Sequence, residues 1–305
     1  MAGRILSTAH GTHRGSFATL DWLLFAAVGT IWGSSFLFMA IGLESFQPGL
    51  VTWLRILFGA ALLWTLPGVR TRIDRADLGP LLILAVSWVV IPFTLFPLAQ
   101  GSVNSAIAGM LNGAAPIFTV VVATILFRRA PGSRQLLGIP IGFLGVAAIA
   151  VSAAGEGRSQ LVGVVMILVA TIGYGIAFNV ATPLQQKYGS LPVMARILAI
   201  GGVLTAPLGL SSIPGSRFTW SSLLAMAAVG VLGTGVAFVL MGRLVGRVGA
   251  TRASIVGYLI PVVALLLGVL IRRDVVGPFA VAGVLLVIVG AYLTSRREVG
   301  DVAGT

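Results

Sequence analysis

Residues 116–145 read PIFTVVVATILFRRAPGSRQLLGIPIGFLG, and residues 261–290 read PVVALLLGVLIRRDVVGPFAVAGVLLVIVG. The second stretch lies under the first at a constant offset of 145 positions (261 minus 116), without a gap. Five identities fall on this offset: Pro116 with Pro261, Arg128 with Arg273, Gly132 with Gly277, Gly138 with Gly283 and Gly145 with Gly290. Matches at proline, glycine and arginine are harder to attribute to shared apolar composition than matched leucines. The register therefore indicates that the chain contains an internal repeat.

The composition is that of a membrane protein. Apolar residues make up 57% of the chain and charged residues 9%, with a mean hydropathy of +1.05. Soluble domains carry about 25% charged residues, so a soluble globular fold is excluded. A membrane-spanning helix needs about 20 apolar residues, and the candidate segments are 22–41, 49–67, 78–99, 103–126, 135–153, 161–181, 191–210, 220–241, 249–271 and 277–294. We predict an all-α integral membrane protein with ten transmembrane helices and short loops.

Positive charge is concentrated on alternate connections. If the N-terminus is cytoplasmic, fourteen of the 20 lysines and arginines lie on the inner side, and only Arg158, Arg217, Arg272 and Arg273 lie on the outer side. This bias follows the positive-inside rule and predicts that both termini are cytoplasmic. Nucleic acid is excluded as a partner despite the net charge of +12, because no basic patch is interleaved with aromatic residues.

The number of spans also sets the orientation of the two halves. Each half has five spans, an odd number, so the second repeat is expected to be inverted relative to the first. We expect a cytoplasmic tail at 1–20, five-helix repeats at 21–153 and 161–295, and a second cytoplasmic tail at 296–305. Inverted repeats are common in secondary transporters, whose substrate site lies near the midplane where the halves meet. The alternative is that two apolar stretches agree by composition alone.

Several short motifs, taken in order, resemble those of one family. Residues 31–36 (IWGSSF) followed by Arg55, and residues 233–238 (GTGVAF) continuing through 249–254 (GATRAS) to Pro261, are similar to EamA-type members of the drug/metabolite transporter superfamily. The resemblance covers most of the chain, residues 20–295. It implies ten helices as two inverted five-helix repeats, around a central cavity lined by helices one, three, four, six, eight and nine. It also implies export of small metabolites, amino acids or toxic compounds across a bacterial inner membrane.

The chain departs from this family at two corresponding positions. Similar proteins commonly carry a glutamate about thirteen residues after the prolines of helices four and nine, and here Arg129 and Asp274 occupy those positions. If Asp274 pairs with a basic group at a helix end, the first repeat has no acid at the corresponding position and must close its cytoplasmic end in another way.

Polar and aromatic residues in the implied cavity helices are the candidates for substrate binding: Trp32, Ser35, Trp88, Asn112, Tyr174 and Tyr258. Small-molecule sites are mostly apolar with a few placed polar groups, and this set fits that description. Pro116 and Pro261 each remove a backbone donor, so we expect helix breaks that free carbonyls near Asn112 and Tyr258. The alternative for each residue is ordinary packing or a hydrogen bond to its own helix.

Two arginines, Arg55 and Arg196, fall inside predicted spans. Charges inside a bilayer are costly and usually functional. In a functional role, Arg55 would attract a substrate carboxylate or link helices. In a structural role, it would bond backbone carbonyls or extend to the outer headgroups. Arg196 lies nearer the start of its helix, and we expect it to extend to the cytoplasmic surface. We favour the structural role for both side chains.

The acidic residues all fall at span ends, in loops or in tails: Asp21, Glu44, Asp74, Asp77, Glu156, Asp274, Glu298 and Asp301. Proton-coupled pumps relay protons through intramembrane Asp, Glu or His. The placement of the acids therefore favours facilitated diffusion, exchange, or coupling through the substrate's own charge.

Signatures of enzymes are missing from the sequence. The chain has no cysteine, His10 and His13 lie in the N-terminal tail, and no HExxH, GxSxG or Walker A motif is found. We expect no catalytic residue, no metal site and no cofactor. The predicted function is a secondary transporter that exports a small organic metabolite, an amino acid or a related or drug-like compound, by alternating access. A membrane receptor or scaffold protein, or a channel, is the alternative. The expected partners are the substrate and the lipid bilayer, and a homodimer is left open.

Overall fold

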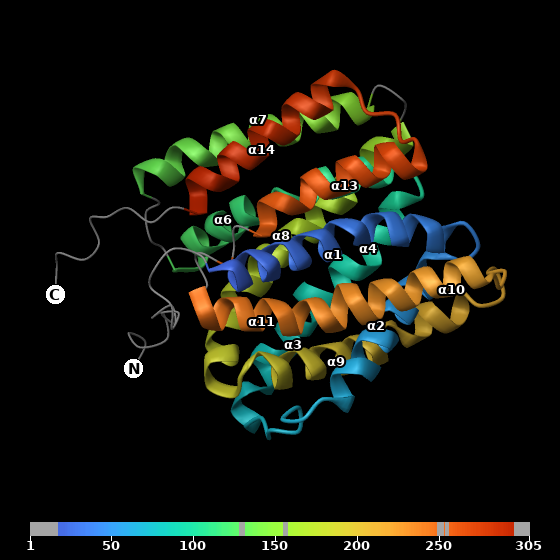
Figure 1. The fold of residues 1–305 in the computed structure, drawn as a ribbon, viewed down its shortest axis with the longest axis vertical. Coiled ribbons are helices and arrows are strands. Elements are labelled where there is room, and N and C mark those ends of the chain that lie inside the picture. Colours follow the sequence, from blue (N-terminus) through green and yellow to red (C-terminus); the bar gives the residue numbers. More distant parts are fainter. Residues whose placement is uncertain (1–17, 128–131, 155–157, 249–252, 254–255, 296–305) are drawn as a thin grey trace.

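The computed structural model describes residues 18–127, 132–154, 158–248, 253 and 256–295. Throughout these ranges the regular structure is helical, and the helices lie side by side in one bundle (Figure 1). Eight helical stretches are long and apolar enough to cross a membrane: Thr19–Leu43, Pro48–Thr65, Arg75–Gln100, Ser105–Ile125, Ser133–Ser152, Gln160–Tyr188, Ser190–Ser211 and Trp220–Val245. Val256–Arg272 and Pro278–Leu293 are shorter apolar helices. The predicted all-α membrane fold is confirmed, whereas the count of ten transmembrane helices stays a prediction.

The helices follow the same order in both halves. The first half contains α1 (Thr19–Leu43), α2 (Pro48–Thr65), the short 3-10 helix η2 (Arg75–Asp77), α3 (Leu78–Ala85), the π-helix η3 (Val86–Val90), α4 (Ile91–Gln100), α5 (Ser105–Asn112), α6 (Ala115–Phe127) and α7 (Ser133–Ala154). The second half contains α8 (Arg158–Tyr188), α9 (Ser190–Ser211), α10 (Trp220–Ala227), the π-helix η4 (Ala228–Val236), α11 (Ala237–Val248), α13 (Val256–Arg272) and α14 (Pro278–Ser295). α3, η3 and α4 follow one another directly, as do α10, η4 and α11.

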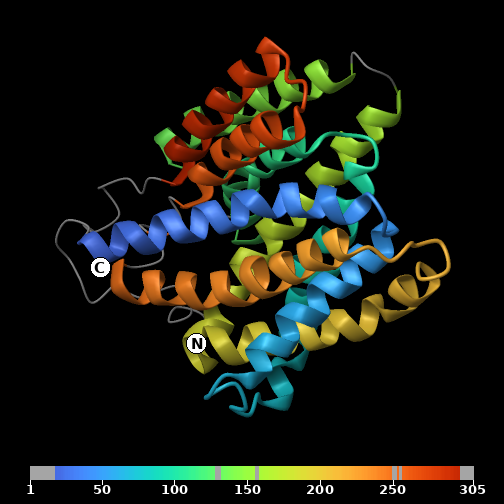
Figure 2. The ribbon, with the colours of Figure 1, turned by 45° about the vertical axis from the view of Figure 1, so that its right-hand side comes forward.

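The helix contacts recur when the two halves are exchanged. α2 packs on α9 and α7 packs on α14, and the members of each pair are counterparts in the two halves. α1 packs on α13 as α8 packs on α6, and α1 packs on η4 and α11 as α8 packs on η3 and α4. Figure 2 shows α1, in blue, between α11 and α13, in orange. This packing agrees with a membrane fold of two repeats.

Contacts at the helix ends show in which direction corresponding helices of the two halves run relative to each other. Gln47 N, just before α2, donates to Ser216 Oγ, just beyond α9, at 2.8 Å. Ser105 Oγ, at the start of α5, donates to Asp274 Oδ2, just beyond α13, at 2.6 Å. In the first case the start of α2 lies beside the end of its counterpart α9. In the second case the start of the run of α5 and α6 lies beside the end of α13, the counterpart of α6, so the counterparts run in opposite directions. Inverted repeats require this relation.

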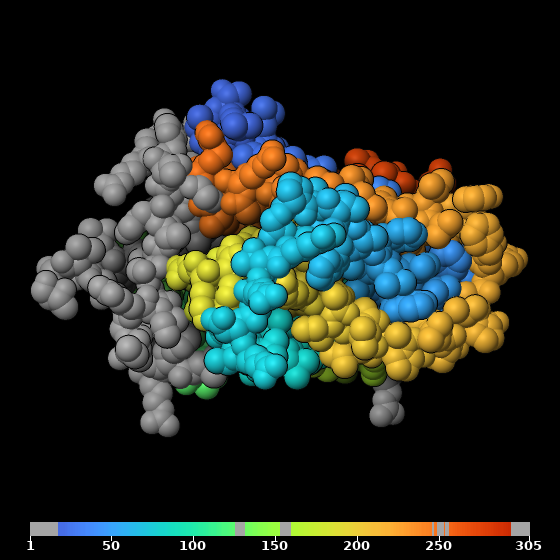
Figure 3. All heavy atoms as spheres, turned by 90° about the horizontal axis from the view of Figure 1, so that it is seen from below, coloured from blue at the N-terminus to red at the C-terminus, as the bar shows by residue number. Residues whose placement is uncertain are grey.

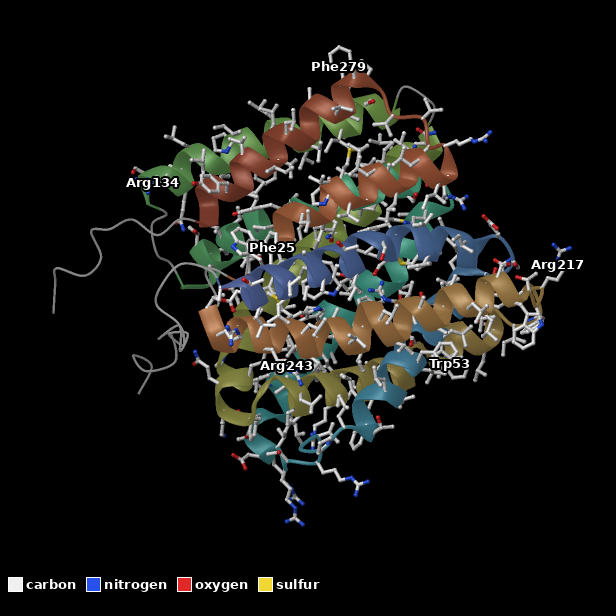
Figure 4. The ribbon with its side chains drawn as sticks, in the orientation of Figure 1. Phe25, Trp53, Arg134, Arg217, Arg243 and Phe279 are labelled. Atoms are coloured by element: carbon white, nitrogen blue, oxygen red, sulfur yellow. The ribbon has the colours of Figure 1, made fainter. Side chains whose placement is uncertain are left out.

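We name the two ends of the bundle after the residues near either end of α1, the Asp21 end and the Glu44 end. Arg134 in α7 lies at the Asp21 end, whereas Arg217, between α9 and α10, lies at the Glu44 end (Figure 4). The sequence assigns these two residues to opposite sides of the membrane, and the bundle holds them at opposite ends. Which end faces the cytoplasm stays a prediction.

Apolar side chains cover the outside of the bundle between its two ends. Val203 of α9 is 73% exposed and Phe279 of α14 is 71% exposed. Leu204 and Leu210 of α9 are also exposed. Figure 3 views the face to which α2, α3 and α9 contribute. Extended apolar surface of this kind marks contact with a membrane or a partner, and here it surrounds a bundle of membrane-spanning length.

Glycines of the internal repeat form close contacts between the halves. Gly145 of α7 and Gly283 of α14 lie so near that a Cβ on either would overlap the partner's backbone. Gly290 lies equally close to the Gly138 carbonyl. Exchange of the halves converts the first contact into the second, because Gly138 corresponds to Gly283 and Gly145 to Gly290. Small residues allow such close approach of helices in membranes, which gives these four identities a physical reason.

Candidate functional site

The two π-helices η3 and η4 lie in the middle of their helical runs and correspond in the repeat. Trp88 of η3 and Gly233 of η4 are separated by the repeat offset of 145 (233 minus 88). π-helical segments are rare and are frequently found at functional sites. The Gly233 carbonyl accepts a hydrogen bond from Trp32 Nε1 of α1 at 3.0 Å. The π-helix of the second half is thereby joined to the first helix of the first half.

Six aromatic rings from both halves meet beside these π-helices. We call them the aromatic cluster: Trp32 (α1), Trp88 (η3), Phe96 (α4), Tyr174 and Phe178 (α8), and Phe238 (α11). The Trp88 ring lies edge-to-face with Phe178 at 5.0 Å and with Phe238 at 5.6 Å between centroids. Phe238 also contacts Trp32 at 6.1 Å, and Tyr174 contacts Phe96 at 6.1 Å and Phe178 at 6.4 Å. The cluster offers an apolar surface with polar edges at mid-bundle.

Arg55 of α2 lies next to the aromatic cluster and is 7% exposed. Its Nε donates to Thr234 Oγ1 of η4 at 3.3 Å, and its Nη1 contacts Met39 Sδ of α1 at 3.5 Å. The guanidinium carbon lies 3.7 Å from the centroid of the Phe93 ring in α4, a cation–π distance. Three other helical segments, η4, α1 and α4, therefore surround one buried cation.

No carboxylate neutralises Arg55 within the described part of the chain. The ion pairs found there lie at the ends of the bundle and join Lys187 to Asp74 and Asp77, Arg247 to Asp21, and Arg272 to Glu44. A guanidinium has five N–H donors, and the contacts of Arg55 are a hydroxyl, a thioether and a ring face. A buried charge without a partner costs several kcal/mol, so this position calls for an anion.

Arg55 shows neither of the two structural arrangements expected from the sequence. Arg55 donates to no backbone carbonyl in the described ranges, and its low exposure shows that it does not extend to the surface. The reason is the close packing of α2 on η4, where a Cβ on Gly59 would overlap Thr234 and one on Gly230 would overlap Phe58. That contact directs the side chain inward.

Arg196 of α9 is coordinated by backbone carbonyls, and its extension to the cytoplasmic surface stays a prediction. Its Nη1 donates to the carbonyls of Val69 at 2.8 Å and Pro192 at 3.1 Å, and its Nη2 donates to the Thr71 carbonyl. Its charge is thus bound by backbone acceptors toward the Asp21 end of the bundle. The two intramembrane arginines therefore differ, since one is coordinated by carbonyls and the other is not.

Ser35 and Tyr258 lie apart from the aromatic cluster. Ser35 Oγ donates to the Ile31 carbonyl of its own helix at 3.0 Å and packs against Gly233. The Tyr258 hydroxyl donates to the Ala291 carbonyl of α14 at 2.7 Å, so the ring points toward the outer pair of helices. Trp32, Trp88 and Tyr174 are the predicted site residues that the fold brings together.

The two prolines have different surroundings. α5 ends at Asn112 and α6 begins at Ala115, so a break precedes Pro116, and Asn112 Oδ1 is buried there without a hydrogen-bond partner in the described ranges. The break expected at Pro261 is absent, because α13 is continuous through it from Val256 to Arg272. A proline inside a helix removes a single backbone donor, which leaves the rest of the helical bonding intact.

Sequence reasoning missed Phe96, Phe178 and Phe238 of the cluster. Phe178 follows Tyr174 by four residues and thus shares its helix face, and Phe238 ends the 233–238 motif. Both signals were present in the sequence. Apolar aromatic residues are common in membrane helices, so contact with Trp88 or Tyr174 in the fold is what distinguishes these three.

A hollow of about 320 Å³ lies on the outside of the bundle, between α4 and α8. Its lining is apolar: Leu95, Leu161, Val162, Val165, Met166 and Val169. Most of these side chains are exposed on the lipid-facing side of α8. The hollow is therefore separate from Arg55 and does not correspond to the central cavity that the resemblance implies.

Polar contacts join the helices at both ends of the bundle. At the Glu44 end, Arg272 Nη1 lies 2.6 Å from Glu44 Oε1, and Asp274 Oδ2 accepts from Ser105 Oγ at 2.6 Å and from Ala106 N at 3.0 Å. Asp274 thus caps α5, and within the described ranges it forms no ion pair with a basic side chain. Arg129, its counterpart, lies outside the described residues.

The Asp21 end is joined by ion pairs. Asp21 is completely buried, and its Oδ1 lies 2.5 Å from Arg247 Nε of α11. Lys187 Nζ lies 2.7 Å from both Asp74 and Asp77. In the ranges that the structure describes, the His, Cys, Asp and Glu residues form no group of three or more that could hold a metal ion.

Comparison with known proteins gives a consistent result over nearly the whole chain. The model of the EamA-like transporter family matches residues 20–151 and again residues 161–296. An "Uncharacterized transporter" of Archaeoglobus fulgidus is 24% identical over 91% of this chain and 99% of its own length. The "Uncharacterized inner membrane transporter YedA" of Escherichia coli is 27% identical over 90% of this chain and 92% of its own.

A relative with a more specific name comes from Streptantibioticus cattleyicolor. This "Probable terminal-alkyne amino-acid exporter" is 27% identical over 92% of this chain and 94% of its own length. A solved crystal structure covers 91% of this chain and 96% of its own, with a TM-score of 0.61 and 17% identity. At that identity the likeness concerns the fold alone.

Proposed function

Since the chain belongs to the EamA-like transporter family and is a membrane transporter, we propose that it exports a small organic metabolite across a bacterial inner membrane by alternating access. The substrate class is an amino acid or a related compound. In this proposal the chain crosses the membrane ten times, with repeats at 21–153 and 161–295 and both termini in the cytoplasm. The inner-membrane location and the outward direction are supported by relatives named as an inner membrane transporter and as a probable exporter.

One observation carries the proposal: the aromatic cluster and Arg55 lie at mid-bundle and are built from both halves. Trp32, Trp88 and Phe96 come from the first half, and Tyr174, Phe178 and Phe238 come from the second. A relative movement of the halves would therefore change this site directly. Inverted-repeat carriers place their substrate at such a boundary and open it to either side in turn.

The contacts at the two ends support the same mechanism. The Glu44 end is joined by the Arg272–Glu44 pair and the Asp21 end by the Arg247–Asp21 pair. Alternating access requires that one set of contacts opens while the other is kept. Since no carboxylate approaches Arg55 or the cluster in the described ranges, we propose uncoupled transport, exchange, or coupling through the substrate's own charge.

The test is uptake into proteoliposomes of a mixed radiolabelled amino-acid pool, with and without unlabelled substrate inside. Saturable uptake that is accelerated by preloading, and equal with and without a pH gradient, is the expected result. Uptake that requires the pH gradient would overturn the uncoupled mechanism. Flux that does not saturate would indicate a channel. W88A, which removes the central ring of the cluster, should lose uptake, whereas W220A at an exposed position of α10 should keep it.

A further inference from the structure

Arg55 is a charged group in the bundle interior whose contacts do not satisfy it. Its five N–H donors meet one hydroxyl and one sulfur atom, at 3.3 and 3.5 Å. Nη2 has no hydrogen-bond partner in the described ranges. Arg196 shows what a purely structural arginine looks like in the same bundle, since three backbone carbonyls coordinate it.

The chemistry that completes the Arg55 site is a planar anion. The guanidinium fork matches a carboxylate with two parallel hydrogen bonds. A ligand carboxylate would also supply the negative charge that the surrounding helices lack. The body of the ligand would then extend toward the aromatic cluster, whose Trp32 donates to the Gly233 carbonyl next to Thr234, the residue that bonds Arg55.

The same site disfavours a net positive charge. No acidic side chain contacts Arg55, and the described acids lie at the ends of the bundle. A cationic ligand would meet the buried guanidinium at close range without an anion to offset it, and like charges in a medium of low dielectric constant repel strongly. The aromatic faces attract a cation more weakly than this repulsion opposes it.

We propose that the substrate is recognised by a carboxylate that binds Arg55, with an apolar or aromatic body against the aromatic cluster, and that net cations are excluded. This proposal rests on the proposed transport function and narrows its substrate class. It also assigns Arg55 a role in binding substrate, in place of one confined to linking helices.

The test compares ligands of one shape that differ in charge. Phenylacetate, 2-phenylethanol and 2-phenylethylamine are added to the protein in lipid nanodiscs at pH 7, and the unfolding temperature is measured at increasing ligand concentration. A ligand that binds the folded state raises that temperature. We expect a saturable rise with phenylacetate and none with the alcohol or the amine. Acetate, butyrate and pyruvate extend the series to smaller anions.

Two variants assign the effect to Arg55. R55K keeps the charge but loses the fork, so phenylacetate should bind about 10- to 100-fold more weakly, and R55Q should abolish the response. R196K is the matched control, because it alters the other intramembrane arginine and should leave the response unchanged. If R55Q does not fold, R55K alone still tests whether phenylacetate binds Arg55.

Several results would overturn the proposal. These are a response to the amine or the alcohol as large as that to phenylacetate, an R55K protein that binds phenylacetate as the wild type does, or no response to any carboxylate in the series. Failure of the transport function has a different signature. Proteoliposome flux of the amine would refute the anion site and leave a carrier, whereas carboxylate binding without flux of any compound would refute the carrier and leave the anion site.

Discussion

Arg55 Nε donates to Thr234 Oγ1 across 3.3 Å, and this bond joins α2 of the first half to η4 of the second. Thr234 is fully buried, and its hydroxyl donates onward to the Val229 carbonyl at 3.2 Å. The π-helix therefore holds the group that orients the buried cation. Transport and stability should both depend on this one hydroxyl.

The first prediction concerns T234V, which keeps the shape of the side chain and removes the hydroxyl. It leaves a charged donor of Arg55 unpaired, and an unpaired buried donor costs about 1–3 kcal/mol. We expect a lower unfolding temperature and a roughly tenfold loss of uptake, since 1.4 kcal/mol is a factor of ten. T234S should restore both. T205V removes a buried hydroxyl that bonds only its own helix, to the Gly201 carbonyl, so it should leave uptake intact. Equal losses in T205V and T234V would show that Arg55 is not involved.

The second prediction uses two tryptophans with matching bonds. Trp32 Nε1 donates to the Gly233 carbonyl and Trp53 Nε1 donates to the Gly202 carbonyl, both at 3.0 Å. W32F and W53F each lose one hydrogen bond between the halves, worth about 1 kcal/mol, so similar losses of stability are expected. Only Trp32 belongs to the aromatic cluster. Uptake kinetics should therefore change in W32F and stay unchanged in W53F, and equal kinetics in the two variants would contradict a substrate role for the cluster.

The fold of this chain could be predicted from its sequence because long apolar runs and the register of 116–145 on 261–290 are properties of the chain alone. The neighbours of Arg55 could not be predicted from the sequence. Met39, Phe93 and Thr234 come from three other helical segments, and Thr234 meets Arg55 where Gly59 and Gly230 let α2 approach η4. No spacing along the sequence encodes that approach.

Tyr258 illustrates a second limit of prediction from the sequence. The sequence places it correctly on a helix, but its hydroxyl bonds Ala291 of α14 and not the centre of the bundle. A helix that is apolar on all sides carries little information about which face is turned inward. Rotation about the helix axis is set by packing against neighbours, here by α14 and by the ring of Tyr292, 6.3 Å away.

The third prediction tests the orientation of the bundle in the membrane. The chain has no cysteine, so single cysteines can be introduced without a background. R217C lies at the Glu44 end and R134C at the Asp21 end (Figure 4). A membrane-impermeant maleimide added to intact cells should label R217C and reach R134C only after the membrane is opened. The reverse pattern would invert the predicted topology, and labelling of both in intact cells would refute a spanning bundle.

The fourth prediction concerns pH and the loop before η2. The hydrogen bond from Lys187 Nζ holds the pKa of the Asp74 carboxyl below its ordinary value of 3.8. A carboxyl with a lowered pKa contributes stability above its unfolded value and loses that contribution as the pH falls through the folded value. The Asp74 amide, which donates to the Tyr188 hydroxyl at 3.1 Å, should therefore stay protected from hydrogen exchange from pH 7 to pH 4 and lose protection only below about pH 3.8. K187M should remove this protection at pH 7. Because Asp74 is exposed, K187M should change the unfolding temperature of the whole bundle little. A large fall in that temperature would show that the contacts of Lys187 stabilise more of the protein than this loop.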